Sequence, residues 1–317
     1  MAAIGTDLQH AADLLIAGEL VAIPTETVYG LAGNAYNEEA VLKIFQVKDR
    51  PSFDPLIVHV GVRDRVRSVA AVIPGSALEL MDAFWPGPLT LVLPKERSIP
   101  DLVTSGQDTV AMRMPSHPIA LELLSRLPFP LAAPSANPFG YISPTTPQHV
   151  ADQLGGKIPY ILDGGPSSVG VESTIIGWNG SDSWMLYRLG GVPIEAIEKI
   201  TGKLLPPYGR AQHPPAPGML ASHYAPRKPV FVGNIEDLIA ADPGKKIGVI
   251  ALHRHYPVHR SVVLSADRDL AQAARRLFAA LRELDKSDCD VILAELFPET
   301  GLGRAINDRL KRAAVAR

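Results

Sequence analysis

Cations and hydroxyl groups recur in short polar segments of the first 191 residues. Each segment follows or borders an apolar run, so the end of a predicted strand would present its side chains to a ligand. The segments are residues 24–30, 48–55, 109–113, 134–145, and 170–175 taken together with 187–191. They carry the cations Lys48, Arg50, Arg113 and Arg188. Cations two residues apart suit a polyphosphate, and a loop fixed by prolines and a glycine, as in 134–145, suits phosphate oxygens.

Each of these residues also has an ordinary structural role that the sequence leaves open. Lys48 and Arg50 would form a solvated loop pair, and Arg113 and Arg188 would neutralise carboxylates at the edge of the core. His59, which interrupts an apolar run, would be a hydrogen-bonded core histidine. Cap or turn roles are open to the four remaining candidates, Thr25, Thr27, Ser135 and Asn137.

The charge balance favours the anion-binding interpretation. Residues 1–205 contain 14 Lys and Arg against 21 Asp and Glu, a net charge of −7, whereas the rest of the chain has 17 against 12, a net charge of +5. When an acidic half places cations at several strand ends at once, an anion between them is indicated. We therefore predict one anionic ligand site formed jointly by the segments.

Alternating strands and helices must position these segments. Short apolar runs predict buried strands at 20–23, 56–60, 89–93, 110–114 and 174–176. Helical patterns cover 7–16, 38–47 with Asn37 as the N-cap, and 194–200. This alternation indicates the α/β class.

A proline-rich stretch divides the chain. Seven prolines between 204 and 229 predict an extended linker. Beyond it, strand-like and amphipathic helical patterns alternate again, which predicts a second, smaller, Rossmann-like α/β domain. The predicted strands are 230–232, 246–251, 261–264 and 290–294, and the predicted helices are about 270–284 and 304–314. The predicted organisation is a domain over 1–204, a linker over 205–229 and a domain over 230–317.

Composition excludes several classes of protein. The 317 residues are 46% hydrophobic and 20% charged with a net charge of −2, which is typical of a folded chain. An apolar run of the ~18 residues that a membrane span needs is missing, and so is a basic signal region, so we expect no membrane contact and a cytoplasmic location. With Cys289 as the single cysteine, an internal disulfide or a zinc site built on cysteine pairs cannot form.

Two further motifs favour surface roles. Residues 253–259 hold three histidines but no acidic or cysteine partner at a ligand spacing, so an exposed loop is favoured over a metal site. Near the C-terminus, Arg309, Lys311 and Arg312 predict a solvated helix face, and weak RNA contact is the alternative.

In this order, the polar segments resemble those of the YrdC-like threonylcarbamoyl-AMP synthases. The resemblance extends through 216–226, which is similar to the linker of the longer members, and through 301–310 near the end. An ordered set of this kind is far more specific than one short motif. It implies a YrdC-like catalytic domain with a twisted mixed sheet and flanking helices, a linker that acts as a lid, and a C-terminal accessory domain.

The resemblance also implies an activity. These nucleotidyltransferases combine L-threonine, bicarbonate or carbon dioxide, and ATP into threonylcarbamoyl-adenylate and pyrophosphate. A separate enzyme system then uses the product to make threonylcarbamoyladenosine in tRNA. The resemblance places Thr27, His59, Arg113 and Ser173 around threonine. It places Lys48, Arg50, Thr109, Ser135, Asn137, Ser143, Arg188 and the linker residue Tyr224 around ATP, with Lys48 and Arg50 as the catalytic candidates.

One position departs from the expected pattern. Many relatives carry Asn where this chain has Asp54, a carboxylate beside a presumed triphosphate. Asp54 either binds the magnesium that accompanies ATP, which is the interpretation we favour, or pairs with Lys48 or Arg50.

Two alternative functions remain to be weighed. An RNA-binding module of the same type without adenylate-forming activity would need a cationic surface, which the net charge of −7 disfavours. Carbamoyl transfer in hydrogenase maturation uses a similar domain beside zinc modules, and a chain with one cysteine and 317 residues argues against it.

Overall fold

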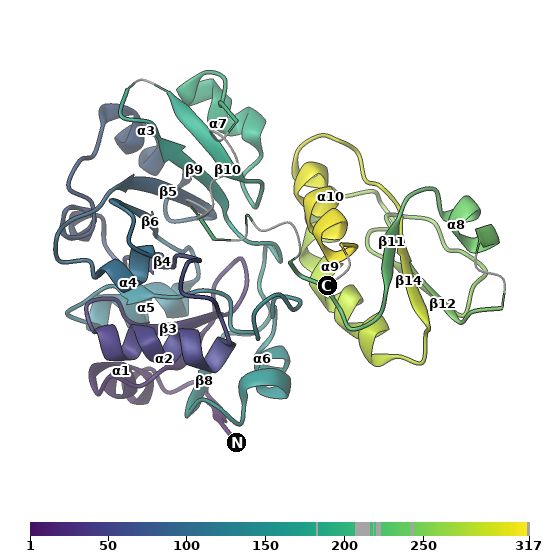
Figure 1. The fold of residues 1–317 in the computed structure, drawn as a ribbon, viewed down its shortest axis with the longest axis horizontal. Coiled ribbons are helices and arrows are strands. Elements are labelled where there is room, and N and C mark those ends of the chain that lie inside the picture. The colour runs from purple at the N-terminus through teal and green to yellow at the C-terminus, as the bar shows by residue number, and fades with distance from the viewer. Residues whose placement is uncertain (182, 207–215, 218, 220–222, 242–243, 316–317) are drawn as a thin grey trace.

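The computed structural model describes residues 1–181, 183–206, 216–217, 219, 223–241 and 244–315. Two α/β domains lie side by side, a larger one formed by the N-terminal part of the chain and a smaller one formed by the C-terminal part (Figure 1). This arrangement confirms the predicted fold class.

The larger domain is built on a twisted mixed sheet. Its strands are β1 Ala3–Gly5, β2 Val21–Ile23, β3 Gly30–Asn34, β4 Ile57–His59, β5 Leu89–Pro94, β6 Thr109–Arg113, β7 Leu131–Ala132, β8 Tyr160–Leu162, β9 Thr174–Trp178 and β10 Trp184–Arg188. They are ordered β1-β8-β2-β3-β7-β4-β6-β5-β9-β10. Because β4 and β6 are parallel neighbours, His59 pairs in register with Arg113.

Helices flank this sheet. They are α1 Leu8–Ile16, α2 Glu38–Lys48, α3 Gly75–Phe84, α4 Asp101–Thr104, α5 Pro118–Arg126, α6 Pro147–Leu154 and α7 Ile194–Thr201, with a 3₁₀ helix at Arg63–Ser68. The predicted cap Asn37 accepts hydrogen bonds from the backbone of Glu39 and Ala40. At the other end of α2, Asp49 adopts the left-handed conformation and turns the chain toward Arg50.

The smaller domain has a parallel sheet covered by helices. Its elements are β11 Val230–Val232, α8 Ile235–Ala241, β12 Ile247–Ala251, β13 Arg260–Val263, α9 Leu270–Lys286, β14 Val291–Ala294 and α10 Leu302–Ala313, with the strands ordered β11-β14-β12-β13. Each predicted strand and helix of this domain is present within two residues of its predicted bounds. The three histidines of 253–259 are exposed, as predicted.

An apolar cluster spans both domains. Val28, Ile142 and Val171 of the larger domain pack in one buried cluster with Tyr224 of the linker and with α9 of the smaller domain, where Phe278 is fully buried. Gly170 touches α9 so closely that a Cβ on it would lie 2.3 Å from the Arg275 Cα, and its φ is +80°. The two domains therefore share a core.

The predicted solvated face near the C-terminus is wrong for Arg309, and one alternative that the sequence left open is excluded. Arg309 is 0% exposed, so it does not belong to a solvated face; only Lys311 of the three cations is exposed. Lys48 and Arg50 are buried, which excludes the alternative of a solvated loop pair. In each case the local pattern does not show which segment packs over these side chains.

Most of the predicted linker, including Gln212 and Gly218, lies outside the described residues. Leu205 continues the larger domain, because its backbone hydrogen-bonds to Trp184 and Leu186 of β10. No helix in the described residues is long and apolar enough to cross a membrane.

Candidate active site

One narrow cavity collects most of the predicted site residues. Its empty volume is about 540 Å³, part of which is open to solvent. The polar residues that line it come from strand ends, their loops and the linker: Thr25, Thr27, Arg50, His59, Arg113, Ser135, Glu172, Ser173, Arg188, His223 and Tyr224. Three predicted cations thus face one space, as an anion site requires.

Arg113 ends β6 beneath the loop that joins β2 to β3. Its Nη1 donates to Thr27 Oγ1 at 2.8 Å, and its Nε donates to the Gly87 carbonyl at 3.2 Å. Its Nη2 lies 2.5 Å from Glu26 Oε1, and both side chains are 4% exposed. The structure therefore shows the carboxylate pairing that the sequence left open, on a guanidinium that also lines the cavity.

His59 lies beside Arg113 on the neighbouring strand. Its ring Nδ1 lies 3.2 Å from the Ile57 carbonyl, and burial, reinforced by the charge of Arg113, lowers the pKa of His59 to about 3. A neutral imidazole at neutral pH adds no positive charge to this end of the cavity.

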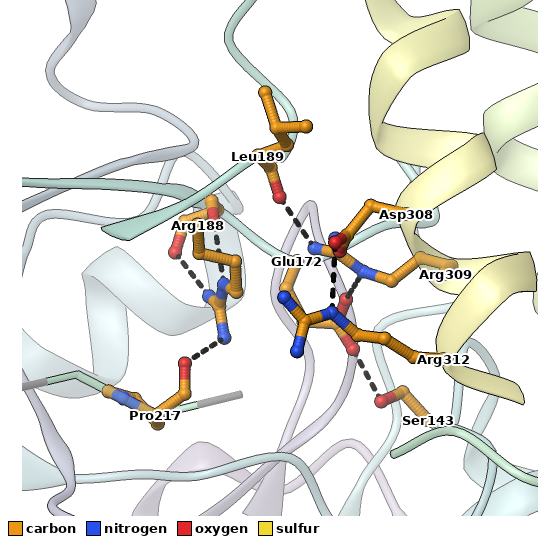
Figure 2. Close-up of polar contacts among 9 residues, drawn as sticks. Ser143, Glu172, Arg188, Leu189, Pro217, Asp308, Arg309 and Arg312 are labelled. Atoms are coloured by element: carbon orange, nitrogen blue, oxygen red, sulfur yellow. Dashed lines mark hydrogen bonds and ion pairs between the residues drawn. The ribbon is translucent and has the colours of Figure 1, made fainter. Parts of the chain in front are cut away.

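Arg188 holds the loop before β9. Its Nε donates to the Ser173 carbonyl at 3.1 Å and its Nη2 to Ser173 Oγ at 3.0 Å, while its Nη1 donates to the Pro217 carbonyl at 3.2 Å (Figure 2). Ser173 Oγ also lies 2.7 Å from Thr90 Oγ1. Burial lowers the pKa of Arg188. This arginine thus connects the predicted threonine contact Ser173 to the linker.

The segment after α2 contains a buried ion pair. Arg50 Nη2 lies 2.9 Å from Asp54 Oδ2, and Arg50 Nε donates to the Asp54 carbonyl at 3.0 Å. Burial raises the pKa of Asp54 and lowers the pKa of Arg50, and each partner's charge opposes that shift. Because Asp54 is 0% exposed and already paired, it does not fit the magnesium role that we favoured.

Lys48 supports the loop that carries Ser135. Its Nζ donates to the carbonyls of Ser135 and Asn137 at 2.5 Å each, and burial lowers its pKa well below the usual value. The Asn137 amide in turn donates to the carbonyls of Pro138 and Tyr141 at 2.8 Å. Both side chains shape the loop rather than line the cavity.

Of the other residues predicted to bind ATP, some line the cavity and some do not. Ser143 Oγ donates to Glu172 Oε1 at 2.5 Å, and Thr109 begins β6 opposite Pro94 at the far end of the strand from Arg113. Neither lines the cavity, and neither does Asp54. Tyr224 does line it, with 1% exposure and a φ of +64°.

Sequence reasoning gave no role to three residues of the site. Glu26 and Glu172 lie inside the predicted polar segments. The rule that a buried arginine needs a carboxylate partner could have identified them. His223, next to Tyr224, is buried, and burial together with the charges of Arg50 and Lys48 lowers its pKa well below the usual value. Its ring packs edge-on against Tyr224, with centroids 4.1 Å apart.

The carboxylates near the cavity are all engaged by arginines. Glu26 faces Arg113, Asp54 faces Arg50, and Glu172 lies 2.8 Å from Arg309 Nε. Among the described residues, no group of three or more His, Cys, Asp and Glu is arranged to hold a metal ion. These residues do not form a magnesium site of their own.

Two family models together match nearly the whole chain. The model described as "Telomere recombination", for Sua5, YciO and YrdC, matches residues 13–190, and the model described as "Threonylcarbamoyl-AMP synthase, C-terminal domain" matches residues 192–315. Both domains seen in the structure therefore have relatives of known type.

Full-length relatives are similar throughout. The chain is 45% identical to the threonylcarbamoyl-AMP synthase of Pyrococcus abyssi over 97% of this chain and 94% of the relative. It is 43% identical to the threonylcarbamoyl-AMP synthase of Bacillus subtilis over 98% of this chain and 93% of that relative. The crystal structure of P. abyssi Sua5 complexed with L-threonine matches with a TM-score of 0.93 at 43% identity, covering 99% of this chain and 97% of that one. The chain belongs to the threonylcarbamoyl-AMP synthase family, in its two-domain form.

Proposed function

We propose that the chain is an L-threonylcarbamoyladenylate synthase. It converts L-threonine, bicarbonate or carbon dioxide, and ATP into threonylcarbamoyl-AMP and pyrophosphate. The observation that carries this proposal is the convergence of Arg50, Arg113 and Arg188 on one cavity, in a chain that is 43% identical to a relative crystallised with L-threonine. The relatives give no support to the RNA-binding alternative.

The site suits a reaction without a protein nucleophile. The threonine amine attacks carbon dioxide and loses a proton to give a carbamate, and a carbamate oxygen then attacks the α-phosphorus, from which pyrophosphate leaves with the bonding electrons. Negative charge builds on the phosphate oxygens, and positioned cations stabilise it. Arg50 and Arg188 supply that charge from fixed, buried positions.

Threonine lies at the Arg113 end of the cavity in this proposal. Arg113 binds the carboxylate, while Thr27, His59 and Ser173 surround the rest of the amino acid. A methyl pocket alone separates threonine from serine by only ~1–3 kcal/mol, so hydrogen bonds to the hydroxyl and carboxylate must supply the remainder. ATP lies toward Arg50, Ser135 and Arg188, with Tyr224 over the nucleotide.

Magnesium enters with ATP rather than on a site of the protein. Mg²⁺ keeps several waters and takes phosphate oxygens readily, and it neutralises phosphate charge when bound. The described carboxylates that adjoin the cavity, Glu26, Asp54 and Glu172, each face an arginine, which argues against a magnesium ligand among them.

The product passes to a separate tRNA-modifying enzyme system. A product that is used to modify tRNA suits a cytoplasmic enzyme. The single cysteine, Cys289, is unpaired, which also suits the cytoplasm.

Pyrophosphate release that requires both threonine and bicarbonate tests the proposal. Arg50→Ala and Arg113→Ala should each lose on the order of 2–4 kcal/mol of transition-state stabilisation, and Arg113→Ala should also weaken threonine binding. Arg254→Ala is the matched control, since Arg254 is an exposed arginine paired with Glu236 on the smaller domain. Pyrophosphate release that ignores threonine would reject the proposal.

A further inference from the structure

Arg309 is a buried arginine that the smaller domain inserts toward the cavity of the larger one. It lies on α10, is 0% exposed, and contacts Glu172 and Leu189 of the larger domain (Figure 2). Burying a guanidinium is costly unless its donors are satisfied, so its partners show what the side chain holds in place.

Arg309 reaches two loops of the larger domain. Its Nε lies 2.8 Å from Glu172 Oε2, and its Nη2 donates to the Leu189 carbonyl at 2.8 Å. Its Nη1 lies 2.7 Å from Oδ2 of Asp308, which also accepts from Arg312 through Oδ1 at 2.9 Å. One side chain thereby fixes two strand-end loops from outside their own domain.

The same side chain also contacts the linker. The centre of its guanidinium lies 5.1 Å from the centroid of the Tyr224 ring. Tyr224 has a φ of +64°, a left-handed conformation that a tyrosine adopts only where its surroundings hold it. The backbone of α10 adds a second contact, because the His223 amide donates to the Arg312 carbonyl at 3.4 Å.

Each segment outside α10 that Arg309 touches carries a residue that lines the cavity. Glu172 and Tyr224 line it themselves, Glu172 directly precedes Ser173, and Leu189 directly follows Arg188. The second oxygen of Glu172 accepts the Ser143 hydroxyl, so the network continues into the loop at 143. A displacement of Arg309 would therefore release three walls at once.

The electrostatics favour a fixed charge at this point. Burial acts to lower the pKa of Arg309, but Tyr224, the carboxylates of Glu172 and Asp308, and the hydrogen bond to Glu172 together outweigh burial and raise it. The guanidinium stays charged, and its attraction for the Glu172 carboxylate is not weakened by solvent.

We propose that Arg309 is a positioning residue for the adenylate-forming reaction, through which the C-terminal domain sets the shape of the substrate cavity. It acts through Glu172, Leu189 and Tyr224 and contacts no substrate itself. The inference rests on the proposed synthase function, and it gives the accessory domain a direct part in that function.

The test compares two substitutions of Arg309 with a control on the same helix. Arg309→Ala removes every contact, and Arg309→Lys keeps the charge but loses the fork that spans Glu172 and Leu189. Arg304→Ala is the control, because Arg304 also joins α10 to the larger domain, at 3.4 Å from Glu195, but lies at the surface away from the cavity. KM and kcat are measured in the full-length protein from threonine-dependent pyrophosphate release.

We expect KM for threonine and for ATP to rise at least tenfold in Arg309→Ala and severalfold in Arg309→Lys, with Arg304→Ala within twofold of the unaltered protein. Hydrogen exchange of the Lys variant should increase at residues 170–175, 186–190 and 223–225, a readout that does not depend on activity. If Arg309→Ala does not fold, the KM values and the hydrogen exchange of Arg309→Lys test the proposal on their own.

Two results would overturn the inference. One is an Arg309→Lys protein whose KM values and exchange match those of Arg304→Ala. The other is a loss of activity in proportion to the folded fraction with KM unchanged, which is the mark of a purely structural residue. Inactivity of the unaltered protein would instead reject the synthase function on which the inference rests.

Discussion

Glu26 and Arg113 form a buried ion pair, with Oε1 and Nη2 2.5 Å apart, and Arg113 lines the end of the cavity where we propose that threonine binds. Arg113 is also the residue that we propose to bind the threonine carboxylate. Two carboxylates would then share one guanidinium, which has five N–H donors to distribute between them. Glu26 thus sets how much charge Arg113 can offer to a substrate.

Glu26→Gln should bind threonine severalfold more tightly, because the substitution removes a negative charge beside the incoming carboxylate. Titration calorimetry with L-threonine measures this. Glu122→Gln is a suitable control, since Glu122 pairs with Arg126 on the surface of α5. Weaker binding in Glu26→Gln would mean that Glu26 orients Arg113 and does not compete with the substrate.

Asp54→Asn should leave the magnesium dependence of pyrophosphate release unchanged while lowering the free energy of unfolding. Removing one partner of a buried ion pair leaves Arg50 uncompensated, which costs about 3 kcal/mol. Magnesium titration and urea unfolding measure the two effects separately. A shifted magnesium requirement at unchanged stability would instead support Asp54 as a magnesium ligand.

Acidification below pH 6.5 should destabilise the protein through His59. The pKa of His59 is lowered to about 3 in the folded chain, so between about pH 6.5 and 3 the unfolded chain takes up a proton that the folded chain does not. The contribution of His59 is full above pH 6.5 and falls by about 1.4 kcal/mol per pH unit below it. His59→Gln should remove this part of the slope in urea unfolding measured from pH 7 to 4. An unchanged slope would contradict the neutral, buried state of the ring.

Cutting the chain near Gln212 should leave the first domain folded but much less active. The truncated domain keeps β10 and its pairing with Leu205 but loses the cavity wall at Pro217, His223 and Tyr224. We expect kcat/KM to fall on the order of 100-fold, since water then reaches a hydrolysable carbamate and adenylate. Circular dichroism establishes folding and pyrophosphate release establishes activity; full activity in the truncated protein would refute a lid.

Local patterns were sufficient to predict some of the elements but not others, such as the helices α3 and α5. The predicted helix over 38–47 is α2 with its cap Asn37, and the predicted strand over 89–93 is β5 with one further residue. No strand was predicted at β3 or β7, because β3 contains Gly30 and Gly33 and β7 is two residues long, so neither carries a periodic apolar signal. Tertiary pairing alone makes these segments strands.

The site was predictable as a set of cations but not as a set of partners. Arg50, Arg113 and Arg188 were expected to converge, and they line one cavity. The partner of Arg309 could not be found in the same way, because Glu172 lies 137 residues earlier in the chain. Alternating hydrophobic and polar positions show that a helix has an outer face, but not that another domain covers that face.

The contact at Gly170 limits how this protein can be redesigned. Because main chain meets main chain there, with no side chain to trim or repack, a foreign accessory module grafted onto the first domain would have to reproduce the path of α9 beside residue 170. Exchanging the C-terminal domain between relatives should therefore succeed only when this part of α9 and the loop that contains Gly170 come from the same protein.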